Sequence, residues 1–181
     1  AMDPQQRVAL EVSYEAMEQA GALHEVLVGV SGAMTTGNEL PTGETSPFAA
    51  TGASMAVLAN RISYSLGFSG PSLTIDTVCS SSLVAMHTAC KSMHNGDCKM
   101  AIVVGVNLLQ SMVGYAAKCS AGMLSRKGRC ATFSDQADGY APGEGCGAVV
   151  LKPLPAAVED GDGVWGVLHG SAVNQDGRTA T

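Results

Sequence analysis

Short, continuous apolar runs alternate along this chain with longer stretches in which apolar residues recur every three or four positions. The runs at 26–30, 73–75, 100–106, 147–152 and 164–173 lack polar alternation, which is typical of strands covered on both faces. The helical spacing predicts helices over about 4–20, 55–66 and 80–95, with a short one at 154–159. Residues 111–125 fit either a helix or a mixed helix–loop segment, and 31–51 and 128–145 are expected to be loops. This order predicts an α/β fold with a largely parallel sheet.

The first helix carries a recognisable start signal and a candidate buried face. Asp3 is expected to be its N-cap, followed by a proline, with Gln6 in a capping-box position. Leu10, Tyr14 and Met17 lie at helical spacing and are expected to face the core.

Cys79 lies where a predicted strand ends and a predicted helix begins. The run Leu73–Ile75 follows a Gly-Pro pair, as a buried strand often does. Beyond Cys79, one helix face is predicted to be formed by Leu83, Met86, Cys90 and Met93.

This position favours reactivity of the thiol. The first turn of a helix has free N–H groups and the positive end of the macrodipole, so a thiolate there is stabilised and can act as a nucleophile. The same N–H groups can hold an oxyanion formed on attack at a carbonyl. Ser80, Ser81 and Ser82 are small and also suit a helix start. The alternative reading is that Cys79 is a small buried hydrophobic residue, which is common for free cysteines.

Several stretches share their sequence with one family. Residues 76–85 read DTVCSSSLVA and resemble the active-site segment of the β-ketoacyl synthase domains of modular polyketide synthases, in which Ala usually precedes the cysteine. Val78 is expected to be compatible with activity, because β-branched residues are tolerated at a strand end. Further matching stretches, in the same order, are DPQQR at 3–7, ANRISY at 59–64, ADGY at 137–140, GEGCG at 143–147 and GSAVNQDG at 170–177.

The resemblance implies a thiolase-like fold, in which two related α/β halves form α/β/α/β/α layers. Residues 1–181 would be a partial ketosynthase domain, mostly its nucleophile-bearing N-terminal half and truncated at both ends. The family's two catalytic histidines would lie beyond the chain, since the residues after His169-Gly170 do not continue the family's histidine motif. The family dimerises through the strand before the nucleophile, here Leu73–Asp76.

The resemblance also implies an activity. Cys79 would be the nucleophile and a backbone oxyanion donor in acyl transfer, followed by decarboxylative Claisen condensation with a malonyl-type extender. Substrates would arrive on the phosphopantetheine of an acyl carrier protein, with no cofactor or metal bound directly. The expected partners are that carrier protein, the second half of the domain and a second copy of the chain. The fragment alone is expected to be inactive.

Other functions stay open at this point. A non-condensing ketosynthase would keep Cys79 but lack a histidine, and a dimerisation or scaffold module would carry an inert thiol. A cysteine hydrolase is disfavoured because no His–acid pattern accompanies Cys79. The sequence does not decide between polyketide and fatty acid synthesis.

The composition restricts the expected partners and the cellular compartment. The 181 residues are 46% apolar and 14% charged with a net charge of −6, which disfavours nucleic acid or an anionic membrane as partner. No apolar run approaches a membrane span, and six cysteines without zinc-site spacing are predicted to be reduced in a cytoplasmic protein. Asp138 and Glu144 are expected to fix a Gly-rich loop, which does not have the strand-to-helix context of a phosphate loop.

Overall fold

A computed structural model describes residues 2–25, 28–34 and 46–179. In chain order its elements are α1 (Pro4–Gln19), β1 (Val28–Met34), α2 (Ala49–Ala53), α3 (Ala56–Leu66), β2 (Ser72–Ile75), the 3-10 helix η1 (Val78–Ser80), α4 (Ser81–His94), β3 (Met100–Asn107), α5 (Met112–Ser120), β4 (Gly145–Leu151) and α6 (Leu154–Glu159). Two compact units contain these elements, residues 1–106 with 146–181, and residues 107–145.

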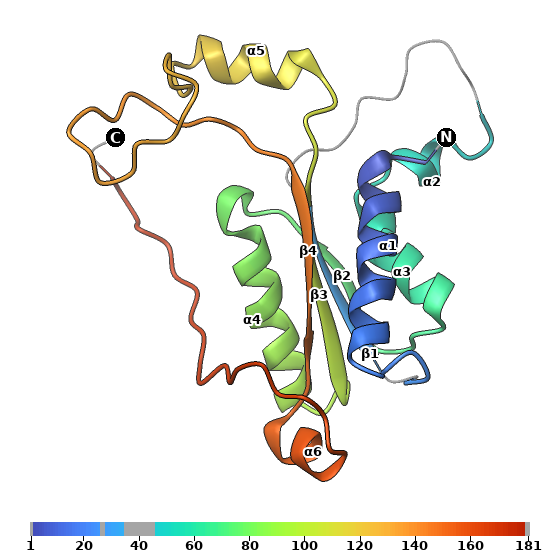
Figure 1. Ribbon diagram of the computed structural model, residues 1–181. Coiled ribbons are helices and arrows are strands. Elements are labelled where there is room, and N and C mark those ends of the chain that lie inside the picture. The colour runs from blue at the N-terminus through green and yellow to red at the C-terminus, as the bar shows by residue number, and fades with distance from the viewer. Residues whose placement is uncertain (1, 26–27, 35–45, 180–181) are drawn as a thin grey trace. The chain divides into compact units, whose positions relative to one another are not determined.

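The first unit is a layered α/β structure, as the sequence predicts. Its four strands lie in the order β2-β1-β3-β4. Strand β1 pairs in parallel with β2, from Val30 opposite Ser72, and with β3, from Val28 opposite Met100. Helix α4 covers one face of the sheet, and α1 and α3 lie on the other (Figure 1).

Helix α4 packs on the sheet through its small residues. Ala85 and Ala89 are buried and contact Ala101 and Val103 of β3 within one apolar cluster. The predicted face is therefore wrong in part: Met86 and Met93 only flank this cluster, and the side chain of Leu83 is 70% exposed. The residues of α4 that are fully buried against the sheet are thus small ones, with larger side chains at the margin of the cluster.

One glycine shows how close that approach is. A Cβ added to Gly105 of β3 would overlap the Ser82 hydroxyl in the first turn of α4. The first turn of α4 can therefore pack directly on the C-terminal end of β3, because Gly105 has no side chain there.

Helix α1 begins as predicted, and its predicted buried face is confirmed at Met17 but wrong at Tyr14. The Asp3 carboxylate accepts the N–H of Gln5 at 2.8 Å, which confirms the N-cap. The capping box is wrong, because the Asp3 N–H donates to the Gly52 carbonyl and Gln6 instead bonds the carbonyls of Thr51 and Ser54. The buried positions include Ala9, Ser13 and Met17, with spacings of four, whereas Tyr14 is exposed and Leu10 half-buried.

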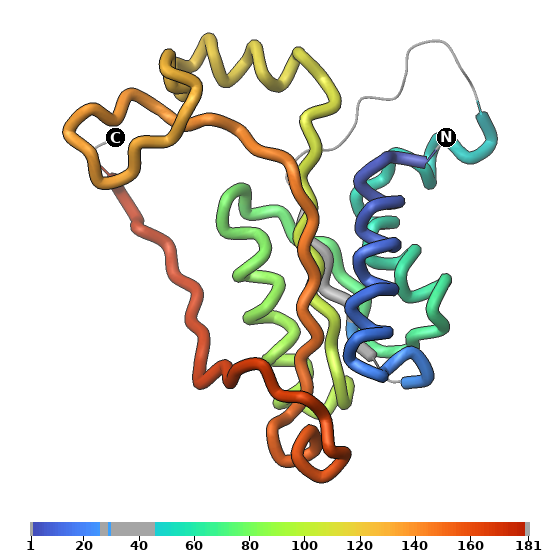
Figure 2. The backbone as a smooth tube through the Cα atoms, in the orientation of Figure 1, coloured from blue at the N-terminus to red at the C-terminus, as the bar shows by residue number. Residues whose placement is uncertain are grey.

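The remaining predicted strands differ in outcome. Strand β1 continues to Met34, past the predicted end at 30, while residues 26, 27 and 35–45 lie outside the described part of the chain. Strand β4 forms close to its predicted bounds, but its positions alternate between exposed and half-buried over most of its length. The predicted strand at 164–173 is wrong: this segment has no regular secondary structure and runs as an extended trace (Figure 2).

The second unit, residues 107–145, carries its own local structure. Helix α5 settles the ambiguous segment, with the Ser111 hydroxyl accepting the Val113 N–H as its N-cap bond. A bridge joins Leu124 to Tyr140, and Gly139, at φ +138°, lies so close to residues 123–125 that a Cβ would not fit. Within the described residues of both units, no helix is long and apolar enough to cross a membrane.

Candidate functional site

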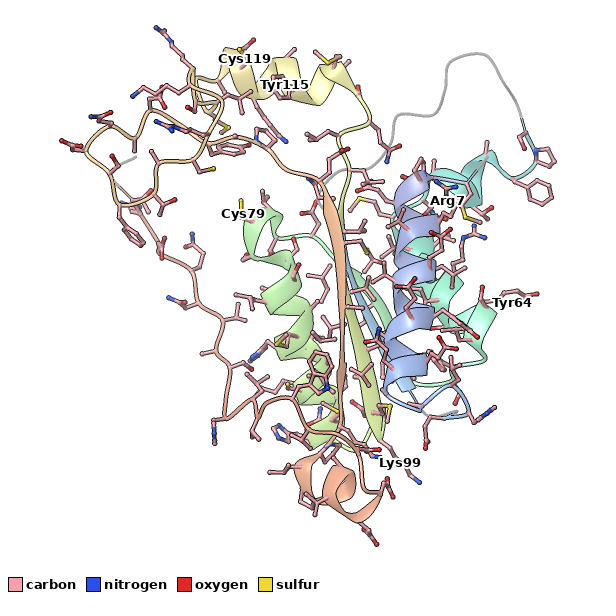
Figure 3. All side chains as sticks on the ribbon, viewed as in Figure 1. Arg7, Tyr64, Cys79, Lys99, Tyr115 and Cys119 are labelled. Atoms are coloured by element: carbon pink, nitrogen blue, oxygen red, sulfur yellow. The ribbon has the colours of Figure 1, made fainter. Side chains whose placement is uncertain are left out.

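Cys79 lies between β2 and α4, as predicted, and its side chain is exposed (Figure 3). The junction differs from the expected one in a detail. Strand β2 ends at Ile75 and α4 begins at Ser81, so Cys79 occupies the intervening 3-10 turn. The thiol therefore stands on a short turn between the strand and the first turn of the helix.

The residue before the thiol has an unusual backbone. Val78 has φ +58°, in the left-handed region that β-branched residues rarely adopt. The expectation that Val78 sits at a strand end is therefore wrong, because β2 stops three residues earlier. The side chain is 65% exposed, so little of it is packed against the described residues.

Two side chains hold the peptide groups on either side of Val78. The Asp76 carboxylate accepts the Val78 N–H at 2.9 Å. The Ser81 hydroxyl donates to the Val78 carbonyl at 2.6 Å and accepts the Thr77 N–H at 2.8 Å. The main-chain N–H of Ser81 also donates to the Val78 carbonyl. Because Ser81 is 1% exposed, its hydroxyl meets little competition from water.

The neighbouring serines do not act as expected. Ser80 is the N-cap of α4, but its hydroxyl makes no capping bond; it donates to the Thr77 carbonyl at 3.0 Å. Ser82 lies against Gly105. These serines therefore brace the turn and the helix position, instead of satisfying N–H groups at the start of α4.

The other thiols divide into exposed and shielded groups. Cys119 and Cys130 are exposed in the second unit, where the Cys130 sulfur accepts the Ala141 N–H at 3.3 Å. Cys98 is buried beneath α4, and burial raises its thiol pKa. Burial likewise raises the pKa of Cys90, and that of Cys146 to about 11. A raised pKa lowers the fraction of thiolate, the nucleophilic form, in these three thiols.

In the described part of the chain, no histidine makes a hydrogen bond to Cys79. The Nδ1 atom of His87 lies 2.9 Å from the Ser171 hydroxyl, and His94 stands in the last turn of α4. His24 and His169 are exposed, the latter in the irregular C-terminal segment. Among the described residues, no group of His, Cys, Asp and Glu is arranged to hold a metal ion.

The two acidic residues singled out in the Gly-rich loop tie it to neighbouring segments of the same unit. Glu144 accepts the Leu109 N–H at 2.6 Å. Asp138 accepts the Ser125 hydroxyl at 2.6 Å, and this bond is the main cause that lowers the pKa of its carboxyl. Both carboxylates are thus occupied within their own unit.

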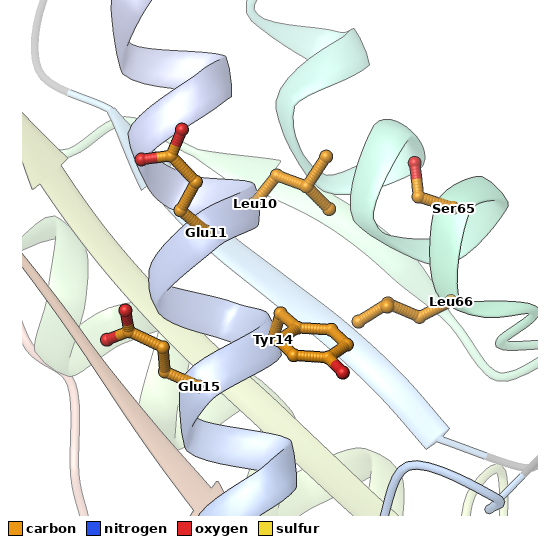
Figure 4. Close-up of a pocket in the computed structure, with 6 residues that line it drawn as sticks. All are labelled: Leu10, Glu11, Tyr14, Glu15, Ser65 and Leu66. Atoms are coloured by element: carbon orange, nitrogen blue, oxygen red, sulfur yellow. The ribbon is translucent and has the colours of Figure 1, made fainter.

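A hollow of about 480 Å³ lies between α1 and α3 (Figure 4). Its lining includes Leu10, Tyr14 and Leu66, with Glu11 and Glu15 beside them. Helix α4 and Cys79 lie on the opposite face of the sheet, so this hollow does not serve the thiol (Figures 1 and 3).

Comparison with known proteins places the turn in a family context. Residues 1–157 match the sequence model described as the N-terminal domain of β-ketoacyl synthase. The chain is 47% identical, over 99% of its length, to a highly reducing polyketide synthase of Aspergillus calidoustus. It is 45% identical, over 97% of its length, to a non-reducing polyketide synthase of Penicillium brevicompactum.

Solved structures of ketosynthases are also similar to this chain. The ketosynthase from module 6 of the bacillaene synthase of Bacillus subtilis matches 99% of this chain with a TM-score of 0.89 and 42% identity. An oxazolomycin ketosynthase domain of Streptomyces albus matches 99% with a TM-score of 0.90 and 40% identity. The chain spans 32% of each of these ketosynthases, and 8% of each of the two curated relatives.

Proposed function

This chain belongs to the β-ketoacyl synthase family, and from that premise we propose that it is the nucleophile-bearing part of a condensing ketosynthase domain. The observation that carries the proposal is the exposed Cys79 on its braced strand–turn–helix junction, inside the stretch that matches the family. The α/β architecture and the likeness to solved ketosynthases support it.

The proposed first step is acyl transfer. The Cys79 thiolate attacks the carbonyl carbon of an acyl thioester on the phosphopantetheine arm of an acyl carrier protein. The resulting oxyanion is stabilised by the Cys79 backbone N–H. When the carbonyl re-forms, the C–S bond to the carrier breaks, and the carrier thiolate leaves and takes up a proton.

The proposed second step is condensation. A malonyl-type extender on a carrier protein loses carbon dioxide, and the carbanion attacks the acyl–Cys79 thioester. The new C–C bond forms as the C–S bond to Cys79 breaks, which regenerates the thiolate and leaves a β-ketoacyl chain on the carrier. The two histidines that the family uses for decarboxylation are proposed to come from the rest of the parent domain.

The partners follow from this chemistry. We propose an acyl carrier protein, the remainder of the domain and a second copy of the chain, in a protein working in the cytoplasm. Strand β2 is one of the two outer strands of the described sheet, which is compatible with pairing between two copies.

The test is acylation of the intact ketosynthase domain that carries this chain, with a short acyl N-acetylcysteamine thioester and mass mapping of the adduct. The adduct is expected on Cys79, absent in Cys79→Ala, and retained in the matched control Cys130→Ala, which removes another exposed thiol. An adduct that persists in Cys79→Ala would contradict the proposal and favour a scaffold with an inert thiol. Acylation without extender-dependent release of carbon dioxide would identify a non-condensing ketosynthase.

A further inference from the structure

We propose that Asp76 and Ser81 are positioning residues that fix the direction of the Cys79 backbone N–H by clamping the peptide groups around Val78. The inference rests on the proposed function, because it concerns the oxyanion donor of that reaction. Neither side chain needs to touch substrate for this role.

The argument starts from the planarity of the peptide bond. The Val78 carbonyl and the Cys79 N–H belong to the same peptide group, and in a trans peptide they point in opposite directions. Whatever holds the carbonyl therefore also directs the N–H. The Ser81 hydroxyl donates to this carbonyl at 2.6 Å, alongside the Ser81 N–H.

The clamp is needed because the conformation is unfavourable on its own. A left-handed backbone is unfavourable for an L-residue, and more so for Val78, which is β-branched. Rotating either peptide group next to Val78 would relieve this cost. Asp76 holds the N–H of the preceding peptide at 2.9 Å and Ser81 the carbonyl of the following one, so both rotations are opposed.

Ser81 also ties the Val78–Cys79 peptide to the Asp76–Thr77 peptide, further back along the turn. Its hydroxyl accepts the Thr77 N–H at 2.8 Å while it donates its proton to the Val78 carbonyl, so it acts as donor and acceptor at once. Its burial makes this bridge a fixed part of the turn. Removing the hydroxyl leaves only the Ser81 N–H on the carbonyl.

The experiment compares two reactions of the same thiol in the intact ketosynthase domain. Acylation by an N-acetylcysteamine thioester develops an oxyanion, whereas alkylation by iodoacetamide displaces iodide and does not. In Ser81→Ala we expect acylation of Cys79 to slow by about tenfold or more, since losing an oxyanion donor altogether slows catalysis by about 10²–10³. Alkylation, measured across pH to account for the thiolate fraction, should stay within about twofold.

A matched control is available on the other side of the sheet. Ser13 is also fully buried, and its hydroxyl donates to the Ala9 carbonyl at 2.5 Å. Ser13→Ala therefore removes a comparable buried bond and should leave both rates unchanged. Equal slowing of acylation in Ser13→Ala and Ser81→Ala would overturn the inference, because it would indicate general destabilisation.

Asp76 supplies the second variant, since its side chain is exposed in the described chain and an amide of the same shape can replace its carboxylate. Asp76→Ala should slow acylation more than alkylation, whereas Asp76→Asn keeps an acceptor oxygen and should retain acylation. The inference is overturned if both reactions slow together, or if neither substitution affects acylation. A domain that is never acylated at Cys79 would overturn the proposed function and this inference with it.

Discussion

At the residue scale, the turn around Cys79 concentrates an unfavourable conformation in Val78. Asn is among the few non-glycine residues that adopt φ near +58° readily, and the Val78 side chain is largely exposed. We therefore expect Val78→Asn to raise the free energy of unfolding by about 1 kcal/mol, measured by chemical denaturation of the intact domain. Val78→Ala should raise the free energy of unfolding by less, and it should not raise acylation by orders of magnitude. A loss of stability in Val78→Asn would show that the backbone of Val78 is not unfavourable.

A second prediction at this scale concerns thiol labelling. Cys79 is exposed on a turn that leads into a helix, whereas Cys98 is buried and burial raises the Cys146 pKa to about 11. Brief treatment of the intact domain with iodoacetamide at neutral pH should label Cys79 first, as mapped by mass spectrometry. Faster labelling of Cys130 or Cys146 would count against the nucleophile assignment.

The shielded thiols also predict a pH dependence of stability. The folded-state pKa of Cys146 is raised from its ordinary value of 9.0 to about 11, because burial disfavours the thiolate. Its stabilising contribution is therefore present below pH 9 and is lost as the pH rises from 9 to 11. The midpoint of unfolding should fall over this pH interval, and it should fall less in Cys146→Ala. An equal dependence of the midpoint on pH in the two proteins would contradict the raised pKa of Cys146.

At the element scale, the sequence predicts the order of helices and strands well but predicts buried faces less well. The helix of Cys79 and the strand before it follow from the apolar pattern, and Asp3 follows from cap chemistry. The pattern points to Leu83 as a core residue, whereas the sheet contacts Ala85 and Ala89. Close packing selects small residues, which apolar periodicity ranks below large ones.

The positive φ of Val78 escapes sequence-based prediction for a related reason. The sequence hints at it only indirectly, through Asp76 and Ser81, whose side chains can hydrogen-bond the peptide groups of a turn. Nothing in the residue type of Val78 itself indicates a left-handed conformation.

The contact between β3 and α4 gives a prediction at this scale. A Cβ at Gly105 overlaps the Ser82 hydroxyl, so Gly105→Ala should destabilise the domain by about 1–3 kcal/mol, the usual range for overpacking. Ser82→Gly in the same chain should recover part of the loss. Gly147→Ala is the matched control, because this strand glycine has no atom within 4 Å of an added Cβ. Equal effects of the two alanine substitutions in thermal melts would argue against the contact.

At the scale of the whole molecule, the chain leaves apolar surface that its own elements do not cover. The segment predicted as a last strand exposes Trp165 to 97%, and Leu73 of the outer strand β2 is 44% exposed. The residues at 164–173 predict a strand, but the segment is irregular. An apolar run forms a strand only where a partner strand is present, and the run itself does not show whether it has a partner.

We therefore expect the 181-residue chain, produced alone, neither to condense substrates nor to remain a stable monomer. Covering even ~1,000 Å² of apolar surface is worth about 25 kcal/mol as an upper bound, more than the roughly 5–15 kcal/mol by which domains are stable. Size-exclusion chromatography with light scattering should show association. A monodisperse monomer with one cooperative melting transition would contradict this, and so would extender-dependent carbon dioxide release.

The bonds that brace Cys79 have one more consequence, for inheritance. The side-chain hydrogen bonds around Val78 join residues only two to four positions apart, all within Asp76–Ser81. A genetic crossover outside these six codons would therefore keep the partners of these hydrogen bonds together. Recombination would then change the surroundings of the thiol while the residues that hold Val78 passed together from parent to hybrid.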